Sequence, residues 1–285
     1  MPTTDVSPVA TRFITQPPPD AAGWVAAFDA REIPVLESTE LALQELGANE
    51  DAVDAHLLAD VMIADPLMTL KLLRHVAALR RGRDQSDPET ATEALVMLGI
   101  TPFFRHFGSQ PTVEHGLADQ PAALYGLRQV LKRAHRAARF ALAFAVHRHD
   151  HDAALLHEAA LLHDFAEMLL WVHAPALALA LQKRQRAEPG LRSIEAQHSL
   201  LHIELTDLQQ ALMKTWRLPA LLVQISDDHS SPLAQVRNVQ LAIRLARHSA
   251  HGWDNPALPD DIDEIAALLN LGLTPTLNLL HDLSS

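Results

Sequence analysis

From residue 24 onward, apolar residues recur at intervals of three and four, the spacing of a helix buried along one face. Between residues 41 and 76, three such stripes follow one another, and Gly47 ends the first of them. Asp65 and Pro66 open the third stripe, because an aspartate caps a helix well and a proline fits its first turn. The segment PETATEALVMLG predicts a short helix that ends at Gly99.

Longer helices rich in alanine and leucine follow a turn-rich segment, residues 108–121. They are predicted over 122–148, 153–172, 175–187, 194–217, 219–226 and 235–251, with a last pair near 260–270 and 274–283. No run of alternating β-branched residues is long enough to predict a strand, so the fold class is all-α. The expected organisation is a flexible, proline-rich arm over 1–23, an N-terminal helical lobe over 24–115, and a helical bundle with C-terminal helices over 116–285.

The composition fits a globular protein and excludes several kinds of site. Of 285 residues, 48% are hydrophobic and 20% charged. The absence of cysteine excludes disulfides, zinc fingers, iron–sulfur clusters and thiol nucleophiles. The N-terminus does not resemble a signal peptide and no apolar run is long enough to span a membrane, so we expect a cytoplasmic protein with no membrane partner. A net charge of −12 makes nucleic acid an unfavourable partner.

Seventeen histidines stand against a single tyrosine, and several lie near acidic residues on the predicted helices. The pair His163-Asp164 lies within the apolar segment LLHDFAEMLL. Imidazole nitrogens and carboxylate oxygens are the groups that bind manganese, iron or zinc in helical bundles. Adjacent residues of a helix point about 100° apart, so one ion could bind both side chains only at a groove between helices. The null hypothesis is a hydrogen-bonded polar cluster without metal.

The order of these segments resembles the HDOD family of the HD superfamily. ADPLMTLKLLR is similar to an early family helix, TEALVMLGITPF to an A-x-x-x-LG segment, and HEAALLHDFAEMLL to the helix that carries the HD pair. IEAQHSLLHIELTDLQQALMKTWRLP is similar to a segment with a single histidine and W-x-LP, and ISDDHSSP lies where a paired-histidine turn is expected. The resemblance runs from about residue 30 to 250 and implies a smaller N-terminal lobe packed on an HD-like bundle.

The resemblance also implies a set of metal ligands for a divalent ion, whether Mn, Fe, Zn or Mg. Catalytic relatives use a first histidine, the HD pair, further histidines and a final aspartate. The matching positions are His135, His163, Asp164, His202 and His229, with Asp228 where the first of the paired histidines would be.

The sequence departs from the catalytic pattern in two places. The HD-x-GK continuation reads HDFAE, so that Ala166 replaces the glycine and Glu167 replaces a lysine able to stabilise a developing phosphate charge. The final aspartate is expected where Ile243 stands, and His248 is out of phase with that position. The catalytic set is therefore incomplete, and no catalytic residue is assigned.

One further group of side chains is a candidate anion site. Arg128, Lys132 and Arg136 are spaced four apart on one helix face and could receive a phosphorylated nucleotide, although a solvated face has the same pattern. We expect a bacterial-type regulatory protein that acts by binding a signalling partner or a nucleotide messenger, without turnover. The alternative is a metal-dependent HD-type phosphohydrolase or phosphodiesterase. No cofactor is certain, and a homodimer is one assembly that the sequence leaves open.

Overall fold

A computed structural model describes residues 12–80, 88–188, 190–227 and 233–284. Within these ranges the chain is helical throughout, and one isolated parallel bridge between Val35 and Thr112 is the nearest approach to a strand. The all-α prediction is therefore confirmed. The helices are α1 (Ala21–Asp29), α2 (Glu37–Gly47), the short η1 (Glu50–Ala52), α3 (Ala55–Ile63), α4 (Pro66–Leu79), α5 (Ala91–Leu98), α6 (Ile100–Phe107), α7 (Val113–Gly116), α8 (Pro121–His147), α9 (Ala153–Leu162), α10 (Phe165–His173), α11 (Pro175–Ala187), α12 (Ser193–Leu201), α13 (Leu205–Trp216), α14 (Ala220–Ile225), α15 (Ala234–His248), α16 (Leu258–Leu269) and α17 (Leu273–Ser284).

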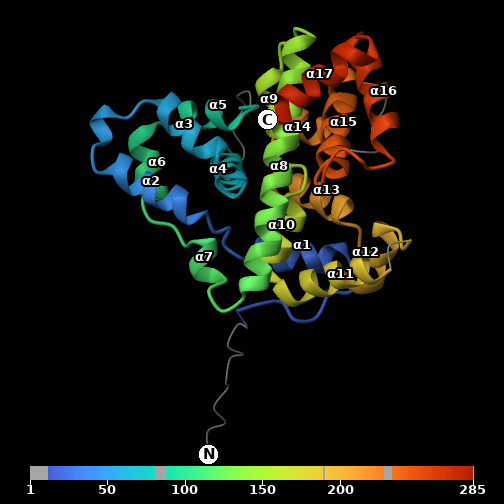
Figure 1. The fold of residues 1–285 in the computed structure, drawn as a ribbon. Coiled ribbons are helices and arrows are strands. Elements are labelled where there is room, and N and C mark those ends of the chain that lie inside the picture. The colour runs from blue at the N-terminus through green and yellow to red at the C-terminus, as the bar shows by residue number, and fades with distance from the viewer. Residues whose placement is uncertain (1–11, 81–87, 189, 228–232, 285) are drawn as a thin grey trace, which may run out of the picture.

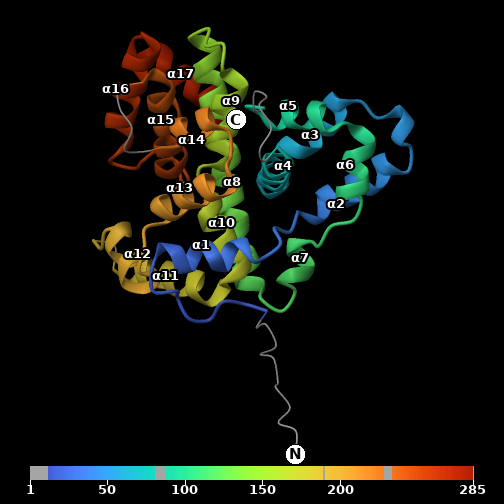
Figure 2. The same cartoon turned by 180° about the vertical axis from the view of Figure 1, so that it is seen from behind.

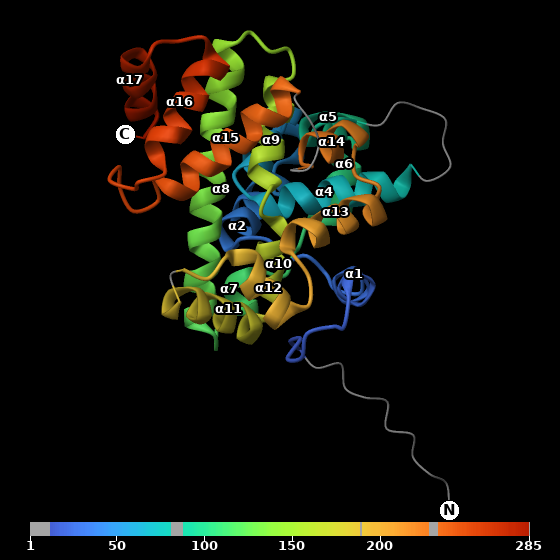
Figure 3. The same cartoon turned by 90° about the vertical axis from the view of Figure 1, so that its right-hand side faces the viewer.

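The helices form two groups on either side of the long helix α8 (Figure 1). We call α2–α7 the N-terminal lobe, and α1 together with α8–α17 the bundle. In Figures 1 and 3, α11 and α12 lie near the N-terminal end of α8, whereas α16 and α17 lie near its C-terminal end. The inner face of α8 packs on α9, α10 and α15, and this arrangement brings residues distant in sequence to one site.

Local signals in the sequence set several helix boundaries as predicted. The Asp65 side chain caps α4 by accepting hydrogen bonds from the backbone N–H groups of Leu67 and Met68, and it also binds the N–H of Leu36 at 2.7 Å. Gly99 ends α5 with a φ of 83°, a conformation that favours glycine. Asp65 thus joins the start of α4 to the segment that precedes α2.

The N-terminal segment differs from the predicted flexible arm over 1–23. Residues 1–11 lie outside the described ranges, but Ile14 is buried and its N–H donates to the carbonyl of His173 at 2.7 Å. Helix α1 belongs to the bundle and not to the lobe predicted over 24–115, and Figure 2 shows it at the same end of the bundle as α11 and α12. Trp24 Nε1 donates to the carbonyl of Leu201, and Trp216 Nε1 donates to Asp29. The physical reason is that two large aromatic side chains one turn apart, Trp24 and Phe28, need a deep apolar surface to cover them.

Two of the predicted long helices are broken. The segment predicted as one helix over 153–172 is interrupted at His163-Asp164, between α9 and α10. The segment predicted over 194–217 is interrupted at His202, which has a φ of 61°. Apolar periodicity continues across both breaks because the flanking helices bury the same kind of face, so the pattern alone did not locate them.

Among the described residues no single helix is long and apolar enough to cross a membrane. One bent pair, residues 153–173 with 175–187, has the required length and composition together, with 116° between its two parts.

A buried carboxyl group connects the bundle to the N-terminal lobe. Glu158 of α9 is 4% exposed, and its Oε2 accepts a hydrogen bond of 2.8 Å from the N–H of Ala91, the first residue of α5. Its other oxygen is buried and has no hydrogen-bond partner among the described residues. Burial raises the pKa of Glu158 to about 8. The carboxyl group is therefore protonated at neutral pH in the folded protein.

Replacing Glu158 with glutamine should remove part of the pH dependence of stability. The folded pKa of about 8 lies above the ordinary value of 4.5, so the folded protein binds one more proton between these limits and the free energy of unfolding falls as pH rises through them. Glu158→Gln keeps an oxygen for Ala91 and should lack this decline. Urea unfolding between pH 5 and pH 8.5 measures it, with the exposed Glu195→Gln as the control. Equal slopes for wild type and Glu158→Gln would contradict the assignment.

Candidate functional site

The His163-Asp164 pair lies at the junction of α9 and α10, and the break in the helix gives both side chains access to one site. Asp164 has a φ of −105° and a ψ of 22°, outside the helical range, and α10 begins at the next residue. Both side chains are buried, and His163 Nδ1 lies 3.2 Å from Asp164 Oδ1. On an unbroken helix these neighbours would point about 100° apart.

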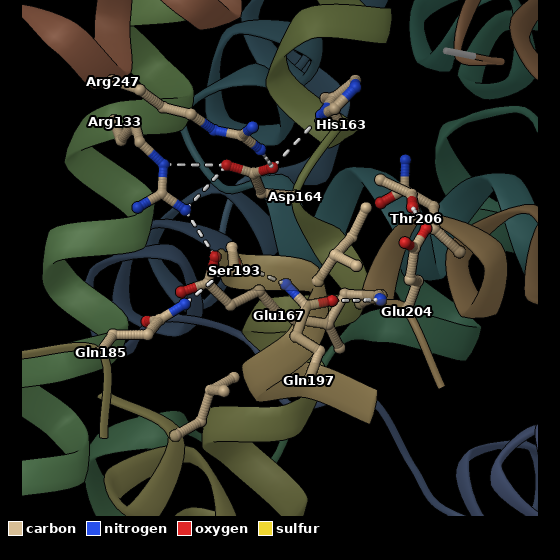
Figure 4. A pocket seen from close by; sticks show the side chains of 15 residues that line it. Arg133, His163, Asp164, Glu167, Gln185, Ser193, Gln197, Glu204, Thr206 and Arg247 are labelled. Carbon is tan, nitrogen blue, oxygen red and sulfur yellow. Dashed lines mark hydrogen bonds and ion pairs between the residues drawn. The ribbon is translucent and has the colours of Figure 1, made fainter. Parts of the chain in front are cut away.

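Two arginines bind the Asp164 carboxylate, one on each oxygen. Arg133 of α8 donates from Nε to Oδ2 at 2.9 Å, and Arg247 of α15 donates from Nη2 to Oδ1 at 2.7 Å. Figure 4 shows the two guanidinium groups converging on this carboxylate, with His163 beside it. Asp164 thus joins three segments of the bundle through charge-assisted hydrogen bonds.

The charges at this site offset one another. Burial by itself would raise the pKa of Asp164, but the positive charges of Arg247 and Arg133 and the hydrogen bond from His163 hold it well below its usual range. Arg133 also donates from Nη2 to Glu167 at 2.6 Å. Burial works to lower the pKa of Arg133, but Asp164 and Glu167 together raise it above its usual range. Two arginines therefore face two carboxylates, and each charge is paired.

The structure does not bring His135 or His202 to this pair. His135 of α8 forms a hydrogen bond with the backbone of Ala64 in the N-terminal lobe, and burial lowers its pKa. It stands two positions after Arg133, which is about 200° around the helix, so the face that meets Asp164 carries Arg133 instead. His202 points to the N-terminal segment, where its Nδ1 lies 3.2 Å from the carbonyl oxygen of Pro18.

The expected metal site of five ligands is therefore not assembled by the described part of the chain. Within that part, no group of three or more histidine, aspartate or glutamate side chains is placed to hold a metal ion. The fifth predicted ligand, His229, and its neighbour Asp228 lie outside the described residues. The residues that fill the site instead are the two arginines, whose guanidinium groups bind both oxygens of Asp164.

Ile243 stands near the HD pair, as the resemblance implied for the position of the final aspartate. Together with His163 and Arg247 it lines a hollow of about 170 Å³ between α9 and α15. Ile243 is 4% exposed, and Arg247 follows it by one helical turn. An apolar residue stands near the pair where the catalytic pattern has a metal-binding carboxylate, and a cation follows one turn later.

The predicted anion-binding residues of α8 have separate surroundings. Arg128 lies 3.7 Å from Glu114, whereas Arg136 donates to the carbonyl and hydroxyl oxygens of Ser249. Lys132 is exposed to solvent. None of the three lines the pocket beside Asp164.

Sequence reasoning missed Arg133 and Arg247, the residues that bind Asp164. Arg133 does not fit the four-residue spacing that Arg128, Lys132 and Arg136 share, so the spacing does not mark it as a site residue. The one signal for Arg247 in the sequence is its position one helical turn beyond Ile243, which places both residues on the same face of the helix.

A pocket of about 530 Å³ opens beside the pair, between α8, α10, α11, α12, α13 and α15. Its polar wall is rich in amides and hydroxyls (Figure 4). The polar residues besides the charged pair network are Gln185, Ser193, Gln197, Glu204, Thr206 and Gln209.

Most of this polar wall is bonded to itself, but one amide is not. Gln185 and Gln197 both donate to the Ser193 hydroxyl at 2.9 Å, and Gln197 accepts from the N–H of Leu205 at 2.8 Å. Gln209 is 3% exposed and lines the pocket, and its side-chain amide has no hydrogen bond to any described residue. The amide atoms of Gln209 are not among the fully buried polar atoms that lack a partner, so they reach the open space of the pocket. Gln209 is therefore available to a molecule in the pocket.

Comparison with known proteins identifies a family and structures of similar fold. Residues 33–232 match the family described as the HDOD domain. The MmoQ response regulator from Methylococcus capsulatus str. Bath has a similar fold, with a TM-score of 0.64, 20% identity, and coverage of 88% of this chain and 98% of that one. A virulence factor from Campylobacter jejuni subsp. jejuni also has a TM-score of 0.64, with 15% identity and coverage of 91% and 94%. No curated protein matches the sequence. At these identities the likeness concerns the fold.

Replacing Asp164 with asparagine should destabilise the bundle, because it removes the charge that Arg133 and Arg247 share. We expect the free energy of unfolding at pH 7 to fall by about 2 kcal/mol, which is less than for a fully buried ion pair because Arg247 is partly exposed. Since the pKa of Asp164 is depressed in the folded state, its contribution is present above the unfolded pKa and lost as pH falls below it. The difference between the two proteins should therefore shrink below about pH 4.

Urea unfolding of wild type and Asp164→Asn at pH 7 and pH 3.5 gives both quantities. The exposed Asp60→Asn on α3 is the control and should change neither. A loss that is the same at both pH values would show that the carboxylate charge is not what stabilises the site.

Proposed function

The chain belongs to the HDOD family, and from this premise we propose that it is a non-catalytic signalling protein that acts by binding a partner protein or a nucleotide messenger. The observation that carries the proposal is the occupation of both Asp164 oxygens by guanidinium groups, at 2.9 and 2.7 Å. A hydrolase of the HD type needs this carboxylate as a metal ligand that helps to generate a bound hydroxide. Here Asp164 would have to give up two charge-assisted hydrogen bonds first.

The surroundings of the pair support the same proposal. His135 and His202 bind the backbone of Ala64 and Pro18, which keeps both imidazoles away from Asp164. Glu167, where a catalytic relative has a lysine, is paired with Arg133, so this position supplies no cation to stabilise a developing phosphate charge. These contacts favour a structural role for the HD pair, which connects helices of the bundle. The ligands that a hydrolytic metal centre needs are not brought together.

The pocket beside the pair supports binding of a small polar molecule. Its volume of about 530 Å³ lies within the range of pockets that bind drug-sized ligands. Arg133, Arg247 and Gln209 all line the pocket. The two guanidinium groups keep N–H groups beyond those that bind Asp164 and Glu167, and the Gln209 amide has no hydrogen bond to a described residue. An arginine pair suits a phosphate and an amide suits the edge of a nucleobase, which is the chemistry of a nucleotide messenger.

The first test asks whether the HD pair supports turnover. Protein purified without a histidine tag is incubated with a cyclic dinucleotide and with bis(p-nitrophenyl) phosphate, in the presence of Mn²⁺, Fe²⁺, Zn²⁺ or Mg²⁺. We expect wild type, His163→Ala and Glu167→Gln to show the same background rate, because no metal-bound hydroxide is held at the pair. Circular dichroism verifies that each variant is folded. A wild-type rate that His163→Ala abolishes would overturn the proposal in favour of a phosphohydrolase.

The second test asks whether the pocket binds a messenger. Isothermal titration with a cyclic dinucleotide is carried out on wild type and on Gln209→Leu, which keeps the size of the side chain but removes its amide. We expect binding to weaken by roughly tenfold, the cost of about one lost hydrogen bond to a buried group. Gln182→Leu, on α11 but outside the pocket, is the matched control. Equal affinities for wild type and Gln209→Leu would exclude this pocket as the messenger site.

A further inference from the structure

Helix α8 has a charge opposite to that of the protein as a whole. Residues 121–147 contain five arginines and lysines and neither aspartate nor glutamate, in a chain with a net charge of −12. Two of the five, Arg133 and Arg136, turn toward the bundle, where Arg133 binds Asp164 and Arg136 binds Ser249. The other three, Arg128, Lys132 and Arg139, are exposed.

Six of the exposed residues of α8 lie along one face of the helix, and we call this face the α8 seam. It consists of Tyr125, Arg128, Lys132, Arg139, Leu142 and Val146. Their spacing of three, four, seven, three and four residues is the heptad spacing by which one helix contacts another along its length. Figure 1 shows α8 on the near side of the molecule, running along most of its height.

The seam has an apolar residue at one end, two at the other, and cations between them. Tyr125 is 60% exposed near the start of the helix, and Val146 is 60% exposed near its end, one turn beyond Leu142. Large apolar side chains at this exposure on one helix line are typical of a contact surface when they lie together with charges of one sign.

The cations of the seam make few ion pairs or hydrogen bonds with the described residues of the chain. Arg128 lies 3.7 Å from Glu114 with its own side chain 56% exposed, which is a weak surface pair. Neither Lys132 nor Arg139 has an ion pair or a side-chain hydrogen bond with any described residue. Because the protein as a whole has a net charge of −12 and α8 carries no carboxylate, these cations form a local positive stripe on an acidic protein.

We propose that the α8 seam docks an acidic amphipathic helix of a partner protein. This inference rests on the proposed function, a protein that acts by association, and names the chemistry of the partner. The partner helix carries aspartate or glutamate opposite Arg128, Lys132 and Arg139, and apolar side chains opposite Tyr125 and Val146. The seam spans 22 residues, and the 21 steps between its ends cover about 32 Å at 1.5 Å per residue, which matches one straight helix of six turns. Electrostatic complementarity selects the partner and the apolar ends set its register.

Nucleic acid fits the seam less well than an acidic helix. The net charge of −12 repels a phosphate backbone over the range of a Debye length, whereas a short helix with a few carboxylates feels mainly the local stripe. Leu142 and Val146 extend the seam with aliphatic groups, which have no favourable contact with phosphates.

The test uses a designed 22-residue fluorescent peptide as the probe, with glutamates at the central heptad positions and leucines at the outer ones. Fluorescence anisotropy with the full chain should show binding that weakens with added salt. Lys132→Glu/Arg139→Glu should weaken it by roughly tenfold or more, because two attractions become two repulsions. Lys183→Glu/Arg186→Glu, which reverses two exposed cations of α11, is the matched control and should leave the affinity unchanged.

Four outcomes would overturn the inference. The first is no binding of the probe, and the second is equal loss in both charge-reversed proteins. The third is tighter binding to a labelled DNA duplex or single strand that Lys132→Glu/Arg139→Glu abolishes, which would make the seam a nucleic-acid surface. The fourth is self-association in sedimentation that the same variant removes, which would make a second copy the occupant. The turnover assay with His163→Ala reports on the proposed function independently, since none of the three seam cations binds Asp164.

Discussion

The bundle depends on one buried carboxylate and the two cations that bind it. Asp164 lies between α8 and α15 and accepts from Arg133 at 2.9 Å and from Arg247 at 2.7 Å, while α10 begins at the next residue. A lone carboxylate at 9% exposure would be costly to ionise, but paired on both oxygens it stays charged and connects three helices. The same two bonds that make Asp164 structural are those that a metal would have to displace.

This arrangement follows from where the chain leaves its helices. The break at Asp164 turns the HD pair into one site, and the break at His202, with φ of 61°, turns that imidazole toward Pro18. Arg133 and His135 point about 200° apart around the axis of α8, so only one of them can face Asp164. Both histidines and arginines are present on these helices. Which of them faces Asp164 depends on the direction in which each side chain points from its helix, and here the arginines face it, so an ion-paired cluster forms.

Much of the fold could be predicted from the sequence because local signals determine where its helices begin and end. The Asp65 cap, the Gly99 end of α5 and the bounds of α8 to within a residue all follow from capping chemistry and apolar spacing. The interruptions at Asp164 and His202 could not be read, because the residues on both sides keep a buried apolar face. Nor could the ordering of residues 12–23, since a proline-rich segment becomes fixed only when Ile14 and Trp24 find the surface of α10, α12 and α13.

The candidate site was less predictable than the fold because it depends on contacts across long separations. Resemblance located His163, Asp164 and Ile243 together, and the structure places them near one another. It did not locate Arg133 or Arg247, which reach Asp164 from 31 and 83 residues away. A cation that serves as a buried partner and one that faces solvent look alike in sequence. On α8 only the phase of the helix separates Arg133, which stabilises the bundle, from Lys132 and Arg139, which are left for a partner.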